Sequence, residues 1–173
     1  MSEGRYRESE IGLPPLFPIR GFEGSTADYL NELHAQYRRV VGEGGLRLRG
    51  KPVVAAGRQG SDGRDKRFWH LITEVGRFAP RRSLSLRRCA WLPRVLWVLK
   101  AMAAGDPRCI WWRENRRDLH GVPLDVSCHL VLRERTSYFM LATAYTVDND
   151  DRRARLIDRA AESWRSGDSA RRD

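Results

Sequence analysis

The sequence predicts a single α+β domain in which a helical N-terminal part packs on a curved, mainly antiparallel four-stranded sheet and a further helix follows at the C-terminus. Two observations predict this fold class. Apolar residues recur at helical spacing in three separate segments, and the segments between them alternate or form short apolar runs, as strands do. The chain has 173 residues, of which 41% are apolar, and this suits one domain with a substantial core better than two.

The N-terminal residues are expected to form a lead-in and then a helix. Residues 1–24 mix charges with prolines and are interpreted as an extended segment. Ser25 or Thr26 is a suitable N-cap for a helix that ends at Gly42. The apolar positions of this helix fall on one face: Leu30, Leu33, Tyr37, Val40 and Val41. The domain is therefore expected to span residues 25–164, with a disordered polar tail over residues 165–173.

The next segment is expected to contain an edge strand and a loop. Residues 46–49 alternate between leucine and arginine, and residues 52–55 are expected to continue this strand at a sheet edge, where proline is tolerated. The glycine-rich residues 57–64 lack the Lys-Ser or Lys-Thr of a phosphate-binding P-loop, so we interpret them as a mobile loop. Residues 68–74 form an apolar run whose periodicity fits either a strand or a short helix.

A second helix is expected to begin at Pro93, which suits a first helical position because its missing N–H has no intrahelical partner there. Its apolar stripe ends at Gly105 and comprises Leu92, Val95, Leu96, Leu99, Met102 and Ala103. Residues 109–113 are interpreted as a strand. Because neighbouring strand residues point to opposite faces, one of Trp111 and Trp112 is expected in the core.

Residues 126–147 are interpreted as a β-hairpin that precedes a last helix. On the first strand of the hairpin, one set of alternating residues is expected to face the core: Cys128, Leu130 and Leu132. The other set is expected on a second surface: His129, Val131, Arg133 and Arg135. Asp148 or Asp150 can cap the last helix, whose apolar face comprises Ile157, Ala160, Ala161 and Trp164.

The length of the hairpin loop decides which residues share that second surface. A two-residue loop at Arg135 and Thr136 would place Thr143 and Tyr145 in the core, whereas a three-residue loop pairs His129 with Thr143. Two-residue loops favour Gly or Asn, and neither occurs here, so the longer loop is predicted. In that register, four side chains share one face that His70 can approach: His129, Arg133, Thr143 and Tyr145.

The charge balance favours an anionic partner. The sequence contains 32 Lys and Arg against 22 Asp and Glu, a formal net charge of +10. Phosphate backbones are the commonest partners of such a chain, although an arginine-rich composition can also reflect coding bias. We therefore expect a nucleic acid as the partner.

The three cysteines and the hydropathy limit the class of protein further. Cys89, Cys109 and Cys128 are odd in number and contain no Cys-x-x-Cys pair, so neither a disulfide framework nor a zinc finger is indicated. The chain has no signal-peptide pattern and no apolar run long enough to cross a membrane. A reduced, cytoplasmic protein without a membrane partner is expected.

The residues that remain for chemistry are histidine, arginine, threonine and tyrosine. No His-x-x-x-His or paired-carboxylate motif indicates a metal site, and no Gly-x-Ser-x-Gly turn indicates acyl transfer. RNA cleavage by the 2′-hydroxyl needs a base, an acid and fixed cations around the phosphate. Histidine titrates in the useful range and arginine can clamp phosphate through two N–H groups. These side chains can equally be a satisfied buried histidine, a solvated strand edge and ordinary strand residues.

Four motifs resemble a family of small phage- and mobile-element-associated bacterial proteins that belongs among the barnase/EndoU/colicin/RelE-like (BECR) nucleases. They are Gly50-Lys51-Pro52, the run from Phe68 to Thr73, Arg87-Arg88-Cys89 and Thr143-Ala144-Tyr145. The similarity spans residues 26–162. It implies a helical N-terminal part, a curved four-stranded antiparallel sheet and metal-independent RNA cleavage, in a toxin or conflict setting.

The resemblance also assigns residues. His70 matches the family histidine, Thr143 and Tyr145 match its last-strand Thr-x-Tyr, and Arg88 begins an Arg-Cys-Glu-Arg-like segment. Ala90 and Trp91 stand where that segment has Glu and Arg. This departure leaves a non-catalytic binding domain open.

The leading hypothesis is a metal-independent endoribonuclease without a cofactor, acting as a toxin or phage-defence effector. Its expected partners are RNA and an acidic antitoxin or immunity protein. The candidate catalytic residues are His70, Arg133, Thr143 and Tyr145, and the candidate nucleic-acid-binding residues are Arg81, Arg82, Arg88, His129 and Arg135. The alternatives are a non-catalytic nucleic-acid-binding domain and a phage-derived protein-interaction domain.

Overall fold

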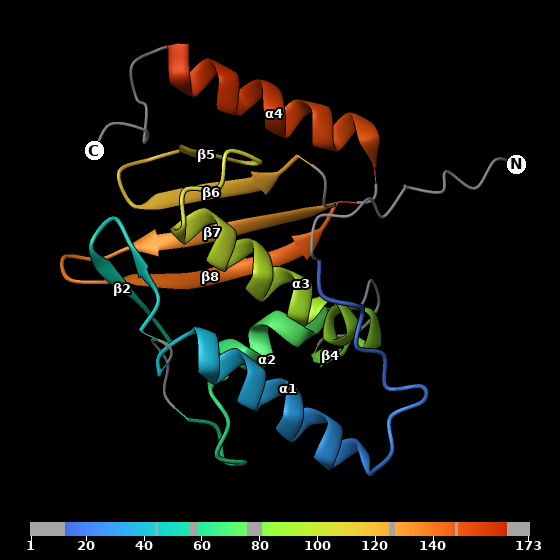
Figure 1. The fold of residues 1–173 in the computed structure, drawn as a ribbon. Helices are drawn as coiled ribbons and strands as arrows, with labels where there is room; N and C mark the ends of the chain where they lie inside the picture. Colours follow the sequence, from blue (N-terminus) through green and yellow to red (C-terminus); the bar gives the residue numbers. More distant parts are fainter. Residues whose placement is uncertain are drawn as a thin grey trace, which may run out of the picture.

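The chain folds as an α+β domain whose sheet is larger than the sequence indicates (Figure 1). The computed structural model describes residues 13–43, 45–55, 59–75, 81–124, 127–147 and 149–165. Its curled six-stranded sheet has the order β1-β2-β8-β7-β6-β5, and a separate two-stranded sheet joins β3 and β4. The predicted α+β class is confirmed, but the predicted four strands are six, and the β2–β8 pair is parallel.

The first helix begins and ends as the sequence predicts. Helix α1 spans Thr26–Val40, and Ser25 caps it in a capping box with Asp28: the Ser25 side chain accepts from the Asp28 N–H, and the Asp28 carboxylate accepts from the Ser25 N–H. The described part of the lead-in, residues 13–24, packs back on the domain. Phe17 stacks on Tyr29 with ring centroids 5.3 Å apart, and the Tyr29 hydroxyl donates to the Phe17 carbonyl.

The segment after α1 is a tight hairpin and not one continued strand. Strand β1 (Arg47–Leu48) pairs antiparallel with β2 (Lys51–Val54). The chain reverses at Arg49 and Gly50, whose φ values of 51° and 75° are both positive, as in the tightest hairpin turns. The reversal leaves β2 beside β8, which adds a parallel strand to the sheet.

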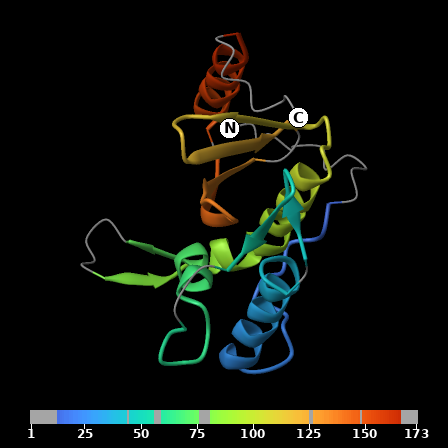
Figure 2. The ribbon, with the colours of Figure 1, turned by 90° about the vertical axis from the view of Figure 1, so that its left-hand side faces the viewer.

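The apolar run that periodicity could not assign is a helix followed by a strand. Helix α2 spans Lys66–Ile72 and leads directly into β3 (Thr73–Val75). Strand β4 (Arg82–Leu84) pairs with β3, and this small hairpin projects from the rest of the molecule (Figure 2). Before α2, residues 59–64 form an ordered turn, because the Asp62 carboxylate accepts from the Arg64 guanidinium and the Trp69 indole.

Helix α3 begins earlier than Pro93, so the predicted start was wrong. It spans Leu86–Ala103, and the side chain of Ser85 accepts from the Arg88 N–H at its N-terminus. Pro93 therefore lies inside the helix. The arginines at its start conceal the helical pattern there, because Leu86 and Arg87 are exposed and the apolar stripe becomes regular only further along.

Strand β6, like the short β4, was not predicted from the sequence. It spans Asp118–Pro123 and lies between β5 (Cys109–Arg113) and β7. Gly121 at its centre faces Met102 of α3, and a Cβ at this position would collide with the Met102 sulfur and terminal methyl group. The glycine thus allows α3 to approach the sheet, although it weakens the strand signal in the sequence.

In the hairpin of β7 (Cys128–Glu134) and β8 (Phe139–Thr146), odd-numbered residues pair with odd-numbered residues near the open end, as predicted. His129 pairs with Tyr145 and Val131 with Thr143, two residues away from the expected pairing. A β-bulge after Val131 then shifts the register, so Arg133 pairs with Met140. The loop is longer than the predicted three residues, since the strands end at Glu134 and Phe139 and the Arg135 N–H donates to the Tyr138 carbonyl.

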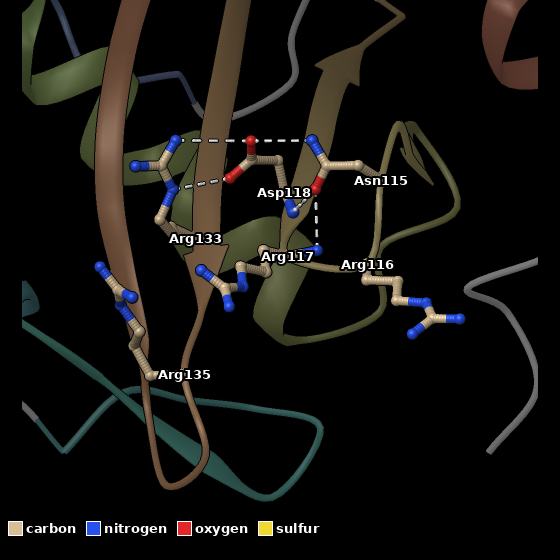
Figure 3. A pocket seen from close by; sticks show the side chains of 6 residues that line it. All are labelled: Asn115, Arg116, Arg117, Asp118, Arg133 and Arg135. Carbon is tan, nitrogen blue, oxygen red and sulfur yellow. Dashed lines mark hydrogen bonds and ion pairs between the residues drawn. The ribbon is translucent and has the colours of Figure 1, made fainter.

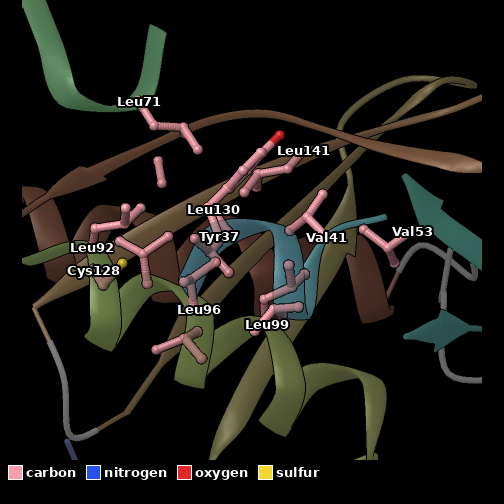
Figure 4. Close-up of a cluster of buried hydrophobic side chains, with 14 of the residues drawn as sticks. Tyr37, Val41, Val53, Leu71, Leu92, Leu96, Leu99, Cys128, Leu130 and Leu141 are labelled. Atoms are coloured by element: carbon pink, nitrogen blue, oxygen red, sulfur yellow. The ribbon is translucent and has the colours of Figure 1, made fainter. Parts of the chain in front are cut away.

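The sheet separates two apolar clusters. The larger lies between the sheet and helices α1, α2 and α3, and includes Tyr37, Leu96, Leu99, Leu130 and Leu141 (Figure 4). The smaller lies on the other side beneath α4 (Asp150–Arg165), and joins Trp112, Val122, Val147, Leu156 and Ala160. Cys89, Cys109 and Cys128 are all buried.

Helix α4 is capped by Asn149, since its side chain accepts from the Asp151 and Arg152 N–H groups. Asp150, one of the two expected caps, is the first residue of the helix, and the other expected cap, residue 148, lies outside the described residues. Within the described chain, no helix combines the length and apolarity needed to cross a membrane.

Candidate nucleic-acid interface

A turn between β5 and β6 forms one wall of a basic hollow. The Asn115 side-chain carbonyl accepts from the Arg117 N–H and the Asp118 N–H, both at 2.8 Å. Its amide nitrogen donates to the Asp118 carboxylate at 3.0 Å. An asparagine that bonds the backbone two and three residues ahead holds a turn in one conformation. The turn therefore presents Arg116 and Arg117 from a fixed backbone.

The hollow lies between this turn and the tip of the β7–β8 hairpin. It has a volume of about 520 Å³ and is lined by Asn115, Arg116, Arg117, Asp118, Arg133 and Arg135. Figure 3 shows Arg117, Arg133 and Arg135 grouped around it, while Arg116 points away from the other three. Arg133 and Arg135 thus share one surface, as the alternation of β7 predicts.

The guanidiniums around the hollow differ in their partners. Arg133 binds Asp118, with Nε donating to the carboxylate at 2.8 Å, and this bond lowers the pKa of Asp118. Arg116, Arg117 and Arg135 are exposed, and their guanidiniums have no hydrogen-bond or ion-pair partner within the described residues. The guanidiniums of Arg117 and Arg135, which are grouped around the hollow, can bind phosphate oxygens through paired N–H donors.

The hairpin tip is fixed on its other face by an ion-pair network. Glu134 binds Lys51 at 2.6 Å and also pairs with Arg113. These two cations hold the pKa of Glu134 below its usual value, although burial acts in the opposite direction. The Lys51 ammonium also donates to the Arg135 carbonyl at 3.3 Å. The network ties β2 and β5 to the base of the tip, so Arg135 projects from an anchored position.

His70 lies elsewhere, in a second basic region at the end of α2. Burial lowers its pKa, and the positive charges of Arg82, Arg67 and Arg88 lower it further. Its side chain makes no hydrogen bond or ion pair with Arg133, Thr143 or Tyr145 in the part of the chain that the structure describes. The four candidate catalytic residues are therefore not one hydrogen-bonded group.

Two of the candidate binding arginines brace this second region. Arg82 donates to the Thr73 hydroxyl at 2.9 Å and to the carbonyls of Thr73 and His70 at 2.6 Å and 3.0 Å. Arg88 donates to the Thr73 carbonyl at 3.0 Å and lies 3.6 Å from the Glu74 carboxylate. Both side chains thus fasten the end of α2 to its neighbours. Arg81 is exposed beside them.

His129 is buried, which corrects its expected place on an exposed basic surface. It is 3% exposed beneath α4, in a hydrogen-bonded chain with His120, which is 8% exposed, and Tyr145. The two imidazoles are 3.0 Å apart at His120 Nδ1 and His129 Nε2, and Trp112 stacks on both rings. The alternation of β7 gave the correct side of the sheet, but the sequence did not reveal that α4 covers it.

The chain of bonds has one consistent direction when both imidazoles are neutral. The Glu114 carboxylate can only accept, so His120 donates to it from Nε2 at 2.9 Å. His120 Nδ1 then accepts from His129 Nε2, and His129 Nδ1 accepts from the Tyr145 hydroxyl. Burial lowers the pKa of His129 to about 3, and the nearby His120, Arg152 and Arg159 act in the same direction. The Tyr145 proton is thus engaged inside the protein.

A smaller and mostly apolar pocket lies between α2, α3 and β8. Arg88, Trp91 and Tyr145 are among its lining residues, so two candidate site residues meet there. Thr143 is half-buried on β8, opposite Val131. Trp91 packs against the large core.

The sequence reading missed Asn115, Arg116, Arg117 and Asp118, although a signal was present. An Asn-Arg-Arg-Asp run directly after a strand is typical of a turn with two projecting cations. The described residues contain no group of three or more His, Cys, Asp or Glu side chains that could hold a metal ion. No family model, curated protein or solved structure matches the chain.

Proposed function

We propose that this protein binds RNA through the basic hollow between the β5–β6 turn and the β7–β8 hairpin tip. The observation that supports this most strongly is the pair of guanidiniums of Arg117 and Arg135, which are grouped around one hollow with Arg133 and have no partner within the described residues. Asn115 and the Glu134 network hold their backbones in place, so few groups have to be ordered when a phosphate binds. The net charge of +10 adds a long-range attraction for polyanions.

RNA is proposed over other polyanions because of the resemblance to the BECR nucleases, and the same resemblance suggests a toxin or defence setting. An acidic antitoxin or immunity protein would then compete with RNA for the guanidiniums of the hollow. Binding of a fluorescent single-stranded RNA of about 12 nucleotides, followed by anisotropy, tests the proposal. Saturable binding that unlabelled RNA displaces supports it, and absence of binding at low salt contradicts it.

Metal-independent RNA cleavage is a second candidate, favoured by the surroundings of His70. Burial and three neighbouring arginines lower the pKa of His70 and so favour its neutral form, which is the form that can take a proton from a 2′-hydroxyl. The same cations would favour a phosphate beside it. The candidate set is narrower than the sequence indicates, because Arg133 is paired with Asp118 and the Tyr145 hydroxyl is bonded to His129. His70 is the residue that we propose for cleavage.

Incubation of the RNA with the protein in EDTA separates the two candidates. Cleavage that His70→Ala abolishes, while RNA binding and the melting temperature are retained, supports the nuclease. As a control, a substrate with 2′-deoxyribose throughout should remain intact, since it lacks the nucleophile. Binding without cleavage leaves the first proposal in place and contradicts the second.

A further inference from the structure

The hollow contains one carboxylate among its cations. Among the described residues, Asp118 is the only acidic one that lines it, beside four arginines and an asparagine. A carboxylate close to a bound phosphate repels it, so a surface that bound phosphates alone would be better without one. Asp118 is also half-buried at the start of β6 and is held in place by two neighbours, Arg133 and Asn115.

Asp118 retains the capacity to accept another hydrogen bond. A carboxylate has about four acceptor positions. Arg133 Nε uses one at 2.8 Å, Arg133 Nη2 uses another at 3.4 Å, and the Asn115 amide uses a third at 3.0 Å. One position on the oxygen bonded to Arg133 Nε therefore remains, and a ligand that uses it must supply a donor.

The other acceptors of the turn each have at least one donor already. The Asn115 side-chain carbonyl accepts from two backbone N–H groups, the Arg117 carbonyl accepts from the Glu134 N–H at 2.6 Å, and the Arg116 carbonyl accepts from Arg113. Among the described side chains that line the hollow, Asp118 is thus the one that retains an acceptor position, since the others only donate or are occupied. The volume of about 520 Å³ exceeds that of a phosphate and leaves room for a sugar.

We propose that Asp118 accepts a hydrogen bond from a ribose 2′-hydroxyl, and that the hollow thereby selects RNA over DNA. This rests on the RNA-binding function proposed above. In RNA the 2′-hydroxyl donor is next to the 3′-phosphate of the same nucleotide, and the hollow likewise has an acceptor in direct contact with a guanidinium. DNA has no donor there, so its phosphates would meet the Asp118 carboxylate without compensation.

Three probes of one mixed sequence test this with the unaltered protein: RNA, DNA and 2′-O-methyl RNA. The methylated probe keeps the sugar oxygen and removes the donor. We expect RNA to bind about tenfold more tightly than either of the others, as for one hydrogen bond to a charged acceptor. Equal affinity for the three probes overturns the inference and leaves RNA binding in place, whereas binding of none contradicts the RNA-binding function itself.

The Asp118→Ala variant adds a second, independent readout. It should raise the affinity for DNA, because a negative charge is removed and Arg133 is released, and it should bring the ratio of RNA to DNA affinity close to one. A preference for RNA that survives this substitution overturns the inference, since Asp118 would then only position Arg133. A preference that follows the bases and not the sugar, measured with homopolymers, also overturns it, because the acceptor would be reading a base amino group.

Discussion

Replacement of Arg117 and Arg135 by alanine should weaken RNA binding most at low salt. Both guanidiniums are exposed, have no partner within the described residues, and line the hollow from opposite walls. If each contacts one phosphate, each releases counterions on binding, and the logarithm of the binding constant changes by about 0.7 per contact for each tenfold change in salt on a single strand. The double variant should therefore lower the salt slope by about 1.4.

The same relation gives the loss of affinity. At ~50 mM salt each phosphate contact raises the binding constant roughly eightfold, so the double variant should bind RNA roughly 60-fold more weakly. At ~200 mM salt the binding constant should fall only about tenfold. The folded state should be nearly unaffected, because exposed arginines contribute less than about 0.5 kcal/mol to stability when they have no partner.

Fluorescence anisotropy over a salt series measures both quantities, and a thermal melt checks the fold. Arg20→Ala is the matched control: Arg20 is also exposed, and it belongs to residues 13–24 of the lead-in, a segment that lies away from the tip of the β7–β8 hairpin (Figure 1). It removes one charge and should change the slope little. If Arg20→Ala lowers the affinity as much as either hollow substitution, binding follows net charge and the site is wrong.

Three further predictions concern single groups. His129 has a folded-state pKa of about 3 against a usual 6.5, so the unfolded chain binds its proton first, and acidification from pH 7 to pH 5 should lower the free energy of unfolding by about 2 kcal/mol. In urea titrations, His129→Gln should lose this part of the pH dependence. An unchanged dependence would show that the buried histidine is not its source. Gly121→Ala should destabilise the folded state by about 1–3 kcal/mol, because the new methyl group would collide with Met102. In a double-mutant cycle with Met102→Ala, the two losses of stability should be clearly less than additive, and additive losses would contradict the contact. Arg133→Ala should weaken RNA binding more than Arg135→Ala, because it also leaves the Asp118 carboxylate without its cation. Since the pair is partly exposed, the free energy of unfolding should fall by at most about 1 kcal/mol, as a thermal melt can check. The reverse order of the two affinities would contradict the role of the pair.

Local signals predicted the ends of the first helix and the faces of β7. The capping box at Ser25 and the alternation from Cys128 to Arg135 depend only on neighbouring residues, and both were confirmed. The start of α3 was not predictable by the same rule, since Pro93 is acceptable at a first helical position, and only packing shows that the helix begins at Leu86.

Strand β6 was missed because its pattern is set by tertiary contacts. Gly121 and Pro123 weaken the strand signal, yet β5 and β7 pair with it on both sides. Without β6, the turn that carries Arg117 and Asp118 could not be placed next to Arg133, although Arg133 itself was expected on the correct face. The β-bulge after Val131 and the cover that α4 places over His129 likewise depend on the assembled sheet.

RNA phosphates are proposed above to bind the arginines of the hollow. The most direct test is an NMR titration of the arginine side-chain Nε–H signals with a short single-stranded RNA, because each signal reports one guanidinium. The claim predicts that the signals of Arg117, Arg133 and Arg135 shift together and saturate at the affinity measured by anisotropy, while that of Arg20 stays in place. Saturable binding that leaves these three signals unchanged would contradict it.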